Sequence, residues 1–211
     1  AIIGECPGPH ELAQGRPFAG PSSALLTAAL QNSGVILSNC FRGYIYNQVP
    51  PGGDIEHISK SDPDFHESLR ILKSDLNKFQ PHCILLLGST PLWAAGSYHR
   101  INVYRGTLFS GFDQHYKCIA TFAPGYVQKV WDEAPLFQFD INRACEESHK
   151  PELKLPLRKL EPSLTASEVL ARLSAIVPGT ITSVDIEGGV PNPEETTHKN
   201  LNGVTCIGIS T

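Results

Sequence analysis

The sequence predicts an α/β protein, a three-layer sandwich with a mainly parallel central sheet. Short apolar runs typical of buried strands, such as PHCILLLG at 81–88, alternate along the chain with segments of helical periodicity. The clearest helix begins after Asp62, with Pro63 in its first turn. Its apolar stripe recurs every three or four residues: Phe65, Leu69, Leu72, Leu76 and Phe79. Strands that alternate with helices favour a parallel sheet covered on both faces, with ligands at the carboxyl ends of the strands.

The other elements expected in residues 1–148 follow from local sequence patterns. Residues 1–7 are typical of a strand that leads into a loop rich in glycine and proline. Ser22 or Ser23 can cap a helix that stops near Gly34, and strand-like pieces follow in 35–49. The later elements are a loop at PPGGD (50–54), a helix at STPLWAAG (89–96), a strand or hairpin opened by Arg105-Gly106, a buried strand at 117–122 and a helix at 135–148.

The character of the chain changes after residue 148. Residues 149–164, HKPELKLPLRKLEPSL, are proline-rich with mixed charge and indicate a linker arm. Thr165 and Glu168 form a capping-box pattern that opens a short helix. Two apolar strands, 180–189 and 203–209, are typical of an antiparallel pair. We therefore expect three parts: a first domain at 1–148, the linker arm, and the beginning of a second domain at 165–211.

Composition indicates an ordinary globular protein. Hydrophobic residues make up 41% of the 211 and charged residues 18%. No apolar run approaches the ~20 residues of a membrane span, and there is no signal-peptide pattern. We therefore expect a cytoplasmic protein without a membrane partner. The six cysteines contain no CxxC pair, so reduced thiols are expected rather than disulfides, zinc or an iron–sulfur cluster.

Both ends of the sequence, AIIGE and GVTCIGIST, look like the inside of strands. We expect further chain before Ala1 and after Thr211. The net charge of −4 argues against a non-specific DNA coat, although a local basic patch is compatible with DNA binding.

The most specific signal lies in GECPGPHELAQGRPFAG, residues 4–20. A strand delivers Glu5 to a glycine-rich loop whose N–H groups can approach a ligand, and Phe18 could stack on a planar ring. On these grounds alone, a tight connection around a buried Phe is an equally good interpretation. The stretch resembles the first motif of the uracil-DNA glycosylase superfamily in its family 4/5 form. Four further stretches follow in family order within residues 1–148: VPPGGD, ILLLG, YRGTLF and TFAPGYVQ.

The resemblance implies a base-binding pocket. A glycosylase takes the base out of the stack and stabilises an oxocarbenium-like transition state. By the resemblance, Glu5 is the carboxylate that activates water or stabilises the cationic sugar, and Phe18 is the stacking ring. Glu11 is a second acidic residue of the loop, and the backbone around Cys6 and Gly8 lines the pocket.

Two positions depart from the family pattern. Where the family has a His that donates to the uracil oxygen, this chain has Ala123. Where the family has an Asn that reads the uracil edge, the ungapped register gives Tyr44, which could fill the pocket. A small gap could bring in Asn39 or Asn47 instead, and His10 is the nearest His that could replace the lost donor. The loop around Ala123 is therefore expected to be a degenerate active-site loop.

Other charged residues are candidates for DNA or metal binding. Arg100 and Arg105 either contact a phosphate backbone or are solvated surface charges. Asp185 and Glu187, two apart on a predicted strand, point to one face and suit a pair of divalent cations, Mg²⁺ or Mn²⁺. This D-x-E resembles the first motif of the RNase H-like 3′–5′ exonuclease domain of family A DNA polymerases, of which 165–211 would be only the beginning.

The order of these parts resembles the N-terminal region of bacteriophage-type DNA-directed DNA polymerases. The implied function is a degenerate, DNA-binding glycosylase-like module ahead of a proofreading exonuclease. Its expected partners are DNA, the remaining exonuclease and polymerase domains of the same chain, and other replication proteins, in the host cytoplasm if the source is a phage. The alternatives are an active uracil-DNA glycosylase and a stand-alone α/β domain that binds a nucleotide.

Overall fold

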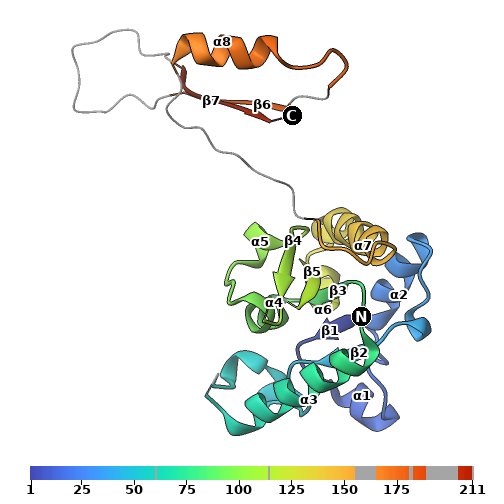
Figure 1. Ribbon diagram of the computed structural model, residues 1–211. Coiled ribbons are helices and arrows are strands. Elements are labelled where there is room, and N and C mark those ends of the chain that lie inside the picture. Colours follow the sequence, from blue (N-terminus) through green and yellow to red (C-terminus); the bar gives the residue numbers. More distant parts are fainter. Residues whose placement is uncertain (60, 114, 155–164, 181–182, 189–203, 211) are drawn as a thin grey trace. The chain divides into compact units, whose positions relative to one another are not determined.

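The computed structural model describes residues 1–59, 61–113, 115–154, 165–180, 183–188 and 204–210 (Figure 1). The chain divides into two compact units, Ala1–Pro156 and Leu157–Thr211.

A five-stranded sheet forms the centre of the first unit (Figure 1). Its strands, in spatial order, are β2 (Arg42–Tyr44), β1 (Ile2–Gly4), β3 (Ile84–Leu87), β5 (Tyr116–Thr121) and β4 (Leu108–Gly111). The first four are parallel, and β4 runs antiparallel to β5. The prediction of an α/β fold with a mainly parallel sheet is confirmed.

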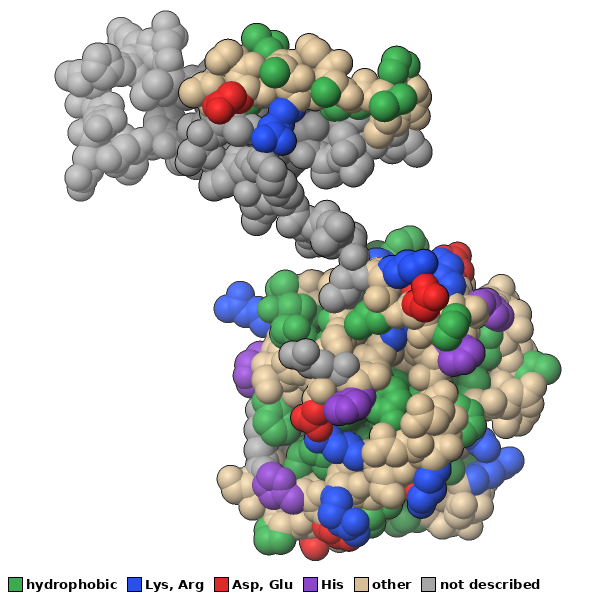
Figure 2. Space-filling view, in the orientation of Figure 1, with side chains coloured by type: hydrophobic (Ala, Val, Ile, Leu, Met, Phe, Trp, Pro, Cys, Tyr) green, Lys and Arg blue, Asp and Glu red, His purple; other side chains and the backbone are tan. Residues whose placement is uncertain are grey.

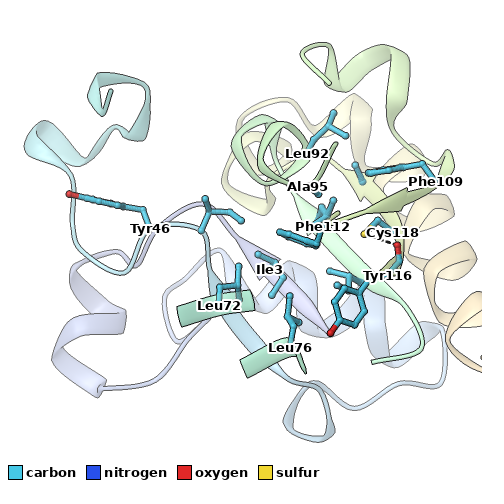
Figure 3. Close-up of a cluster of buried hydrophobic side chains, with 14 of the residues drawn as sticks. Ile3, Tyr46, Leu72, Leu76, Leu92, Ala95, Phe109, Phe112, Tyr116 and Cys118 are labelled. Atoms are coloured by element: carbon cyan, nitrogen blue, oxygen red, sulfur yellow. Dashed lines mark hydrogen bonds between the residues drawn. The ribbon is translucent and has the colours of Figure 1, made fainter. Parts of the chain in front are cut away.

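Helices cover both faces of this sheet because the side chains of the strands alternate. In β3, Ile84 and Leu86 belong to one buried cluster, whereas Leu85 and Leu87 belong to another. Figure 3 shows the first cluster, in which side chains of two helices meet the strands. These helices are α3 (Pro63–Phe79) and α4 (Ser89–Gly96). The second cluster packs against α2 (Ser23–Asn32), α6 (Pro124–Lys129) and α7 (Ala134–Ser148).

The long helix α3 begins where the sequence predicts. The carboxylate of Asp62 accepts hydrogen bonds from the N–H groups of Asp64 (2.8 Å) and Phe65 (3.2 Å). Leu76 on its apolar stripe is fully buried, which contributes about 1.5–3 kcal/mol of transfer free energy. Phe79, the last member of the predicted stripe, is instead 48% exposed and packs against the ring of Phe41 at the end of the helix.

Replacing Asp62 by alanine is expected to lower the free energy of unfolding of this unit by about 1 kcal/mol, because two N–H groups lose their acceptor. Urea unfolding followed by tryptophan fluorescence measures it, since Trp93 packs against Phe65 of this helix. The control is Ser61→Ala, one residue earlier and exposed, which should leave the midpoint unchanged. Equal midpoints for the two variants would show that the cap contributes nothing.

Short helical segments stand where the sequence predicts loops or gives no element. The loop expected after β1 contains α1 (Pro9–Gln14), and the FAPGYVQ loop forms the start of α6. The other short segments are α5 (Ile101–Tyr104) and 3₁₀ turns at Leu37–Asn39, Pro51–Gly53, Ile55–His57 and Trp131–Glu133. Pro at the first helical position supplies the dihedral angle of both α1 and α6, so a proline that suggests a loop in sequence begins a helix here.

A buried lysine fixes the start of the predicted linker arm to the first unit. The side chain of Lys117 on β5 is 2% exposed. Its ammonium donates to the carboxylate of Glu147 at 3.1 Å and to the backbone carbonyls of Lys150 and Glu152. Such a charge is tolerated in the interior only when it is paired and hydrogen-bonded. The first residues of the 149–164 stretch therefore belong to the first unit.

The second unit has the predicted elements. Helix α8 (Ala166–Ser174) begins with the expected capping box, in which the Thr165 N–H donates to Glu168 at 2.8 Å. Strands β6 (Ser183–Gly188) and β7 (Val204–Ser210) are antiparallel. Within the parts of the chain described, no helix is long and apolar enough to cross a membrane.

Candidate functional site

The carboxyl ends of the parallel strands bring the predicted motifs to one edge of the sheet. Glu5 follows β1, Gly88 follows β3, and Ala123 follows β5 by two residues, while Tyr44 ends β2. With neighbouring strands ~4.8 Å apart, the ends of β2 and β5 are roughly 14 Å apart, which leaves room for a planar base between two side chains. This edge is where an α/β sheet places a ligand.

Glu5 lies over the first turn of α4. Its Oε1 is 3.5 Å from the backbone N of Thr90. Gly88, at φ 106°, makes this possible, because a Cβ at that position would lie 2.5 Å from the same oxygen. The N-terminal end of a helix favours a nearby negative charge. The structure thus positions the predicted carboxylate at the edge, and Gly88 is a further part of the site that no sequence motif indicates.

Glu11, by contrast, braces the loop that it belongs to. One carboxylate oxygen accepts from the N–H of Gly8 at 3.0 Å. The other accepts from the N–H groups of Ala19 (3.1 Å) and Gly20 (2.6 Å). These bonds hold both ends of the loop at residues 8–20, called here the motif-1 loop, on one side chain. The carboxylate is therefore engaged with backbone, and its predicted place in the base pocket stays a prediction.

Phe18 and Tyr44 pack against each other beside β1. Their ring centroids are 5.2 Å apart, and a Cβ on Gly4 would lie 3.0–3.1 Å from atoms of both rings. The backbone N–H of Phe18 donates to the Tyr44 hydroxyl at 2.9 Å. Tyr44 is 8% exposed, and burial raises the pKa of its phenol to about 12, so the hydroxyl stays neutral. The ring predicted to stack on a base is thus in contact with a tyrosine from the same protein.

Ala123 presents a methyl group at the start of α6. Its carbonyl accepts from the N–H groups of Tyr126 (3.0 Å) and Val127 (3.2 Å), so the residue has a structural role as a helix cap. Position 123 therefore contributes no side-chain donor to this edge.

Asn47, the residue that a small gap could bring into the base pocket, is exposed, and its backbone N–H donates to Ser68 Oγ at 3.1 Å.

Cys6 is a half-buried thiol next to Glu5. Burial, with smaller contributions from the charges of Glu5, Asp54 and Glu11, raises its pKa to about 11. The thiol is therefore protonated at neutral pH and is a poor nucleophile.

Alkylation of Cys6 by iodoacetamide is expected to be slow near pH 8 and to increase up to about pH 11, because only the thiolate reacts. Peptide-resolved mass spectrometry measures the rate at each pH, with the urea-unfolded chain as the control. In the unfolded chain the rate should reach half of its maximum near pH 8.5, the ordinary pKa of a thiol. The same midpoint in the folded protein would contradict the expected shift.

Arg105, expected either to contact phosphate or to be a solvated surface charge, is paired with a buried carboxylate of the same protein. Its guanidinium donates to both oxygens of Asp140 at 2.9 and 2.7 Å and to the Leu136 carbonyl at 3.0 Å. It also lies 5.6 Å from the centroid of the Phe122 ring, next to Ala123. Asp140 is fully buried and accepts a further bond from Thr121 at 2.8 Å. We therefore assign Arg105 to the support of the β5–α6 turn; no sequence pattern predicts its pairing with Asp140.

The remaining predicted charges are less constrained. Arg100 is exposed at the start of α5. On the face drawn in Figure 2, Lys and Arg side chains of the first unit lie in separate groups rather than in one continuous stripe.

The predicted metal ligands Asp185 and Glu187 lie two residues apart on β6, and their side chains are outside the described part of the structure. Among the described residues, no group of three or more His, Cys, Asp or Glu is placed to hold a metal ion, and the Mg²⁺ or Mn²⁺ site stays a prediction.

A family model for the uracil DNA glycosylase superfamily matches residues 1–146, which include the sheet, its helices and the edge with Glu5. No curated protein matches the chain.

Proposed function

The chain belongs to the uracil DNA glycosylase superfamily, and we propose that its first unit is a DNA-binding module of this family that does not excise uracil. The observation that carries the proposal is the position of Tyr44. Its buried ring lies against Phe18 and over Gly4, and its hydroxyl accepts from the Phe18 backbone. A base that stacked on this face of Phe18 would have to displace a side chain held by packing and by a hydrogen bond.

The second support is the chemistry of Ala123. Base excision places negative charge on the departing base, and a fixed donor at this charge contributes about 10²–10³ in rate. A methyl group contributes no such stabilisation. Tyr44 and Ala123 therefore act in the same direction, the first against binding of the base and the second against cleavage.

Glu5 supports a second candidate, an active glycosylase with altered pocket chemistry. Its carboxylate stands at the first turn of α4, next to Gly88, whose lack of a Cβ leaves the space that the carboxylate fills. A carboxylate in this position suits stabilisation of a cationic sugar. In this candidate the Tyr44 ring moves aside when DNA binds.

A further prediction is that this sequence is the N-terminal part of a DNA-directed DNA polymerase. The family match ends at residue 146, so it gives no support to an exonuclease domain after residue 165. Assays for DNA polymerase and 3′–5′ exonuclease activity of a protein that contains this sequence test the prediction.

Uracil release and DNA binding, measured together on the full 211-residue chain, test the proposal. Fluorescence anisotropy with labelled single- and double-stranded DNA should show binding that weakens with salt. Release of uracil from the same DNA should not exceed that of the Glu5→Gln variant. Release that Glu5→Gln abolishes would establish the second candidate, and no binding to either DNA would refute both.

A further inference from the structure

A cavity of about 340 Å³ lies beside the motif-1 loop. It is formed by residues 16–19, the outer side of α2, the 3₁₀ turn at Leu37–Asn39 and the edge strand β2. Glu5, Tyr44 and Ala123 do not line it. Its volume falls within the range of roughly 300–1,000 Å³ that small-molecule sites occupy.

Two arginines are among the residues that line this cavity. Arg16 and Arg42 both line it, and no Asp or Glu is among its lining residues. Neither arginine forms an ion pair with a described carboxylate; Arg16 donates only to the Gln14 side-chain oxygen, at 3.1 and 2.8 Å. In a chain with a net charge of −4, two uncompensated cations at one cavity favour an anion there. Guanidinium forks match the oxygens of phosphate.

The rest of the lining divides into a polar and an apolar part. The hydroxyl of Thr27 and the amide of Gln31, both on α2, have no side-chain hydrogen-bond partner among the described residues. Ile36 and Leu37 supply an apolar wall, and Ile36 is 58% exposed. A simple inorganic anion would use the guanidinium groups alone. A nucleoside phosphate would use the apolar wall for its base or sugar as well.

We propose that this cavity binds the phosphate of a nucleotide, with the nucleoside against Ile36 and Leu37. The site goes beyond the proposed function. Glu5 and Ala123, at the carboxyl ends of the strands, do not line it, and binding of a phosphate here requires no base beside Glu5. Phe18 belongs to both places, since its backbone is bonded to Tyr44 and it also lines the cavity. The phosphate comes either from a free mononucleotide or from a DNA strand, and the two sources have the same chemistry at the guanidinium groups.

Isothermal titration of the full chain with thymidine 5′-monophosphate, thymidine and inorganic phosphate tests the site. The monophosphate should bind, and more tightly than either of the other two. The double variant Arg16→Gln/Arg42→Gln should weaken its binding by about tenfold or more, because each lost charge-assisted hydrogen bond removes a substantial part of the affinity. The matched control is Arg70→Gln on α3, an exposed arginine paired with Glu67, which should leave binding unchanged.

A second variant separates the cavity from general charge attraction. Thr27→Phe keeps both arginines but fills the space, and it should also abolish binding while the unfolding midpoint stays close to that of the unaltered protein. Titration with 5′-phosphorylated dinucleotides then identifies the source: tighter binding than the monophosphate indicates a strand, and weaker binding a free nucleotide. Equal binding of thymidine and its monophosphate, or full binding by the double arginine variant, would overturn the proposal.

Discussion

Combining Ala123→His with Tyr44→Asn is expected to raise uracil release by about 10²–10³-fold over Tyr44→Asn alone. Tyr44→Asn removes the ring that lies against Phe18 and leaves space for a base. The added histidine then supplies the donor that position 123 lacks. The comparison between the two variants isolates the donor, because both have the same opened pocket.

Single-turnover release of uracil from labelled DNA measures this difference. The control adds Glu5→Gln to the double variant and should return release to background, since the carboxylate at the start of α4 is then neutral. Unfolding midpoints of all three variants exclude loss of fold as the cause. If the histidine adds less than a few-fold, the missing donor is not what limits this scaffold.

Replacing Asp140 by alanine is expected to lower the free energy of unfolding of the first unit by about 3–5 kcal/mol. The carboxylate is fully buried, and it binds both the Arg105 guanidinium and the Thr121 hydroxyl. Burial raises its pKa, while Thr121 and Arg105 act in the opposite direction. Removing the carboxylate leaves Arg105, 16% exposed, without its ionic partner in a nearly dry place.

Urea unfolding followed by tryptophan fluorescence measures this loss, with Asp75→Ala as the matched control. Asp75 pairs with Lys78 on the surface of α3, and the midpoint should not shift measurably when it is removed. The double variant Arg105→Met/Asp140→Leu should be more stable than Asp140→Ala, because it leaves no buried charge without a partner. A double variant as unstable as the single one would assign the loss to packing instead.

The sequence predicts best those elements whose signal is repeated many times. Helix α3 has a cap, a proline and an apolar stripe over 17 residues, and it forms as predicted. Strand β3 has an unbroken apolar run, and it lies in the centre of the sheet. Helices α1 and α6 have six residues each and too few turns to show a period. Isolated helices of this length are marginal in water, so the local sequence alone does not predict them.

The residues of the candidate site also differ in how well the sequence predicts them. Glu5 and Phe18 are found from a motif that is continuous in sequence. The pairing of Tyr44 with Phe18, of Arg105 with Asp140 and the space over Gly88 depend on segments far apart in the chain. The sequence indicates that Tyr44 could fill the pocket, but a single sequence contains no signal for its contact with Phe18, which only the folded chain shows.

The strand order also has a consequence for how the protein folds during synthesis. Strand β1 lies between β2 and β3, and Ile2 pairs with Leu85. A ribosome that adds ~5–20 residues per second needs roughly 4–16 seconds to supply this neighbour. During that time β1 lacks its neighbouring strand β3, and its exposed apolar residues are a target for chaperones. Sheets built from distant segments also fold slowly, so this unit should reach its native state only after residues of β5 have left the ribosome.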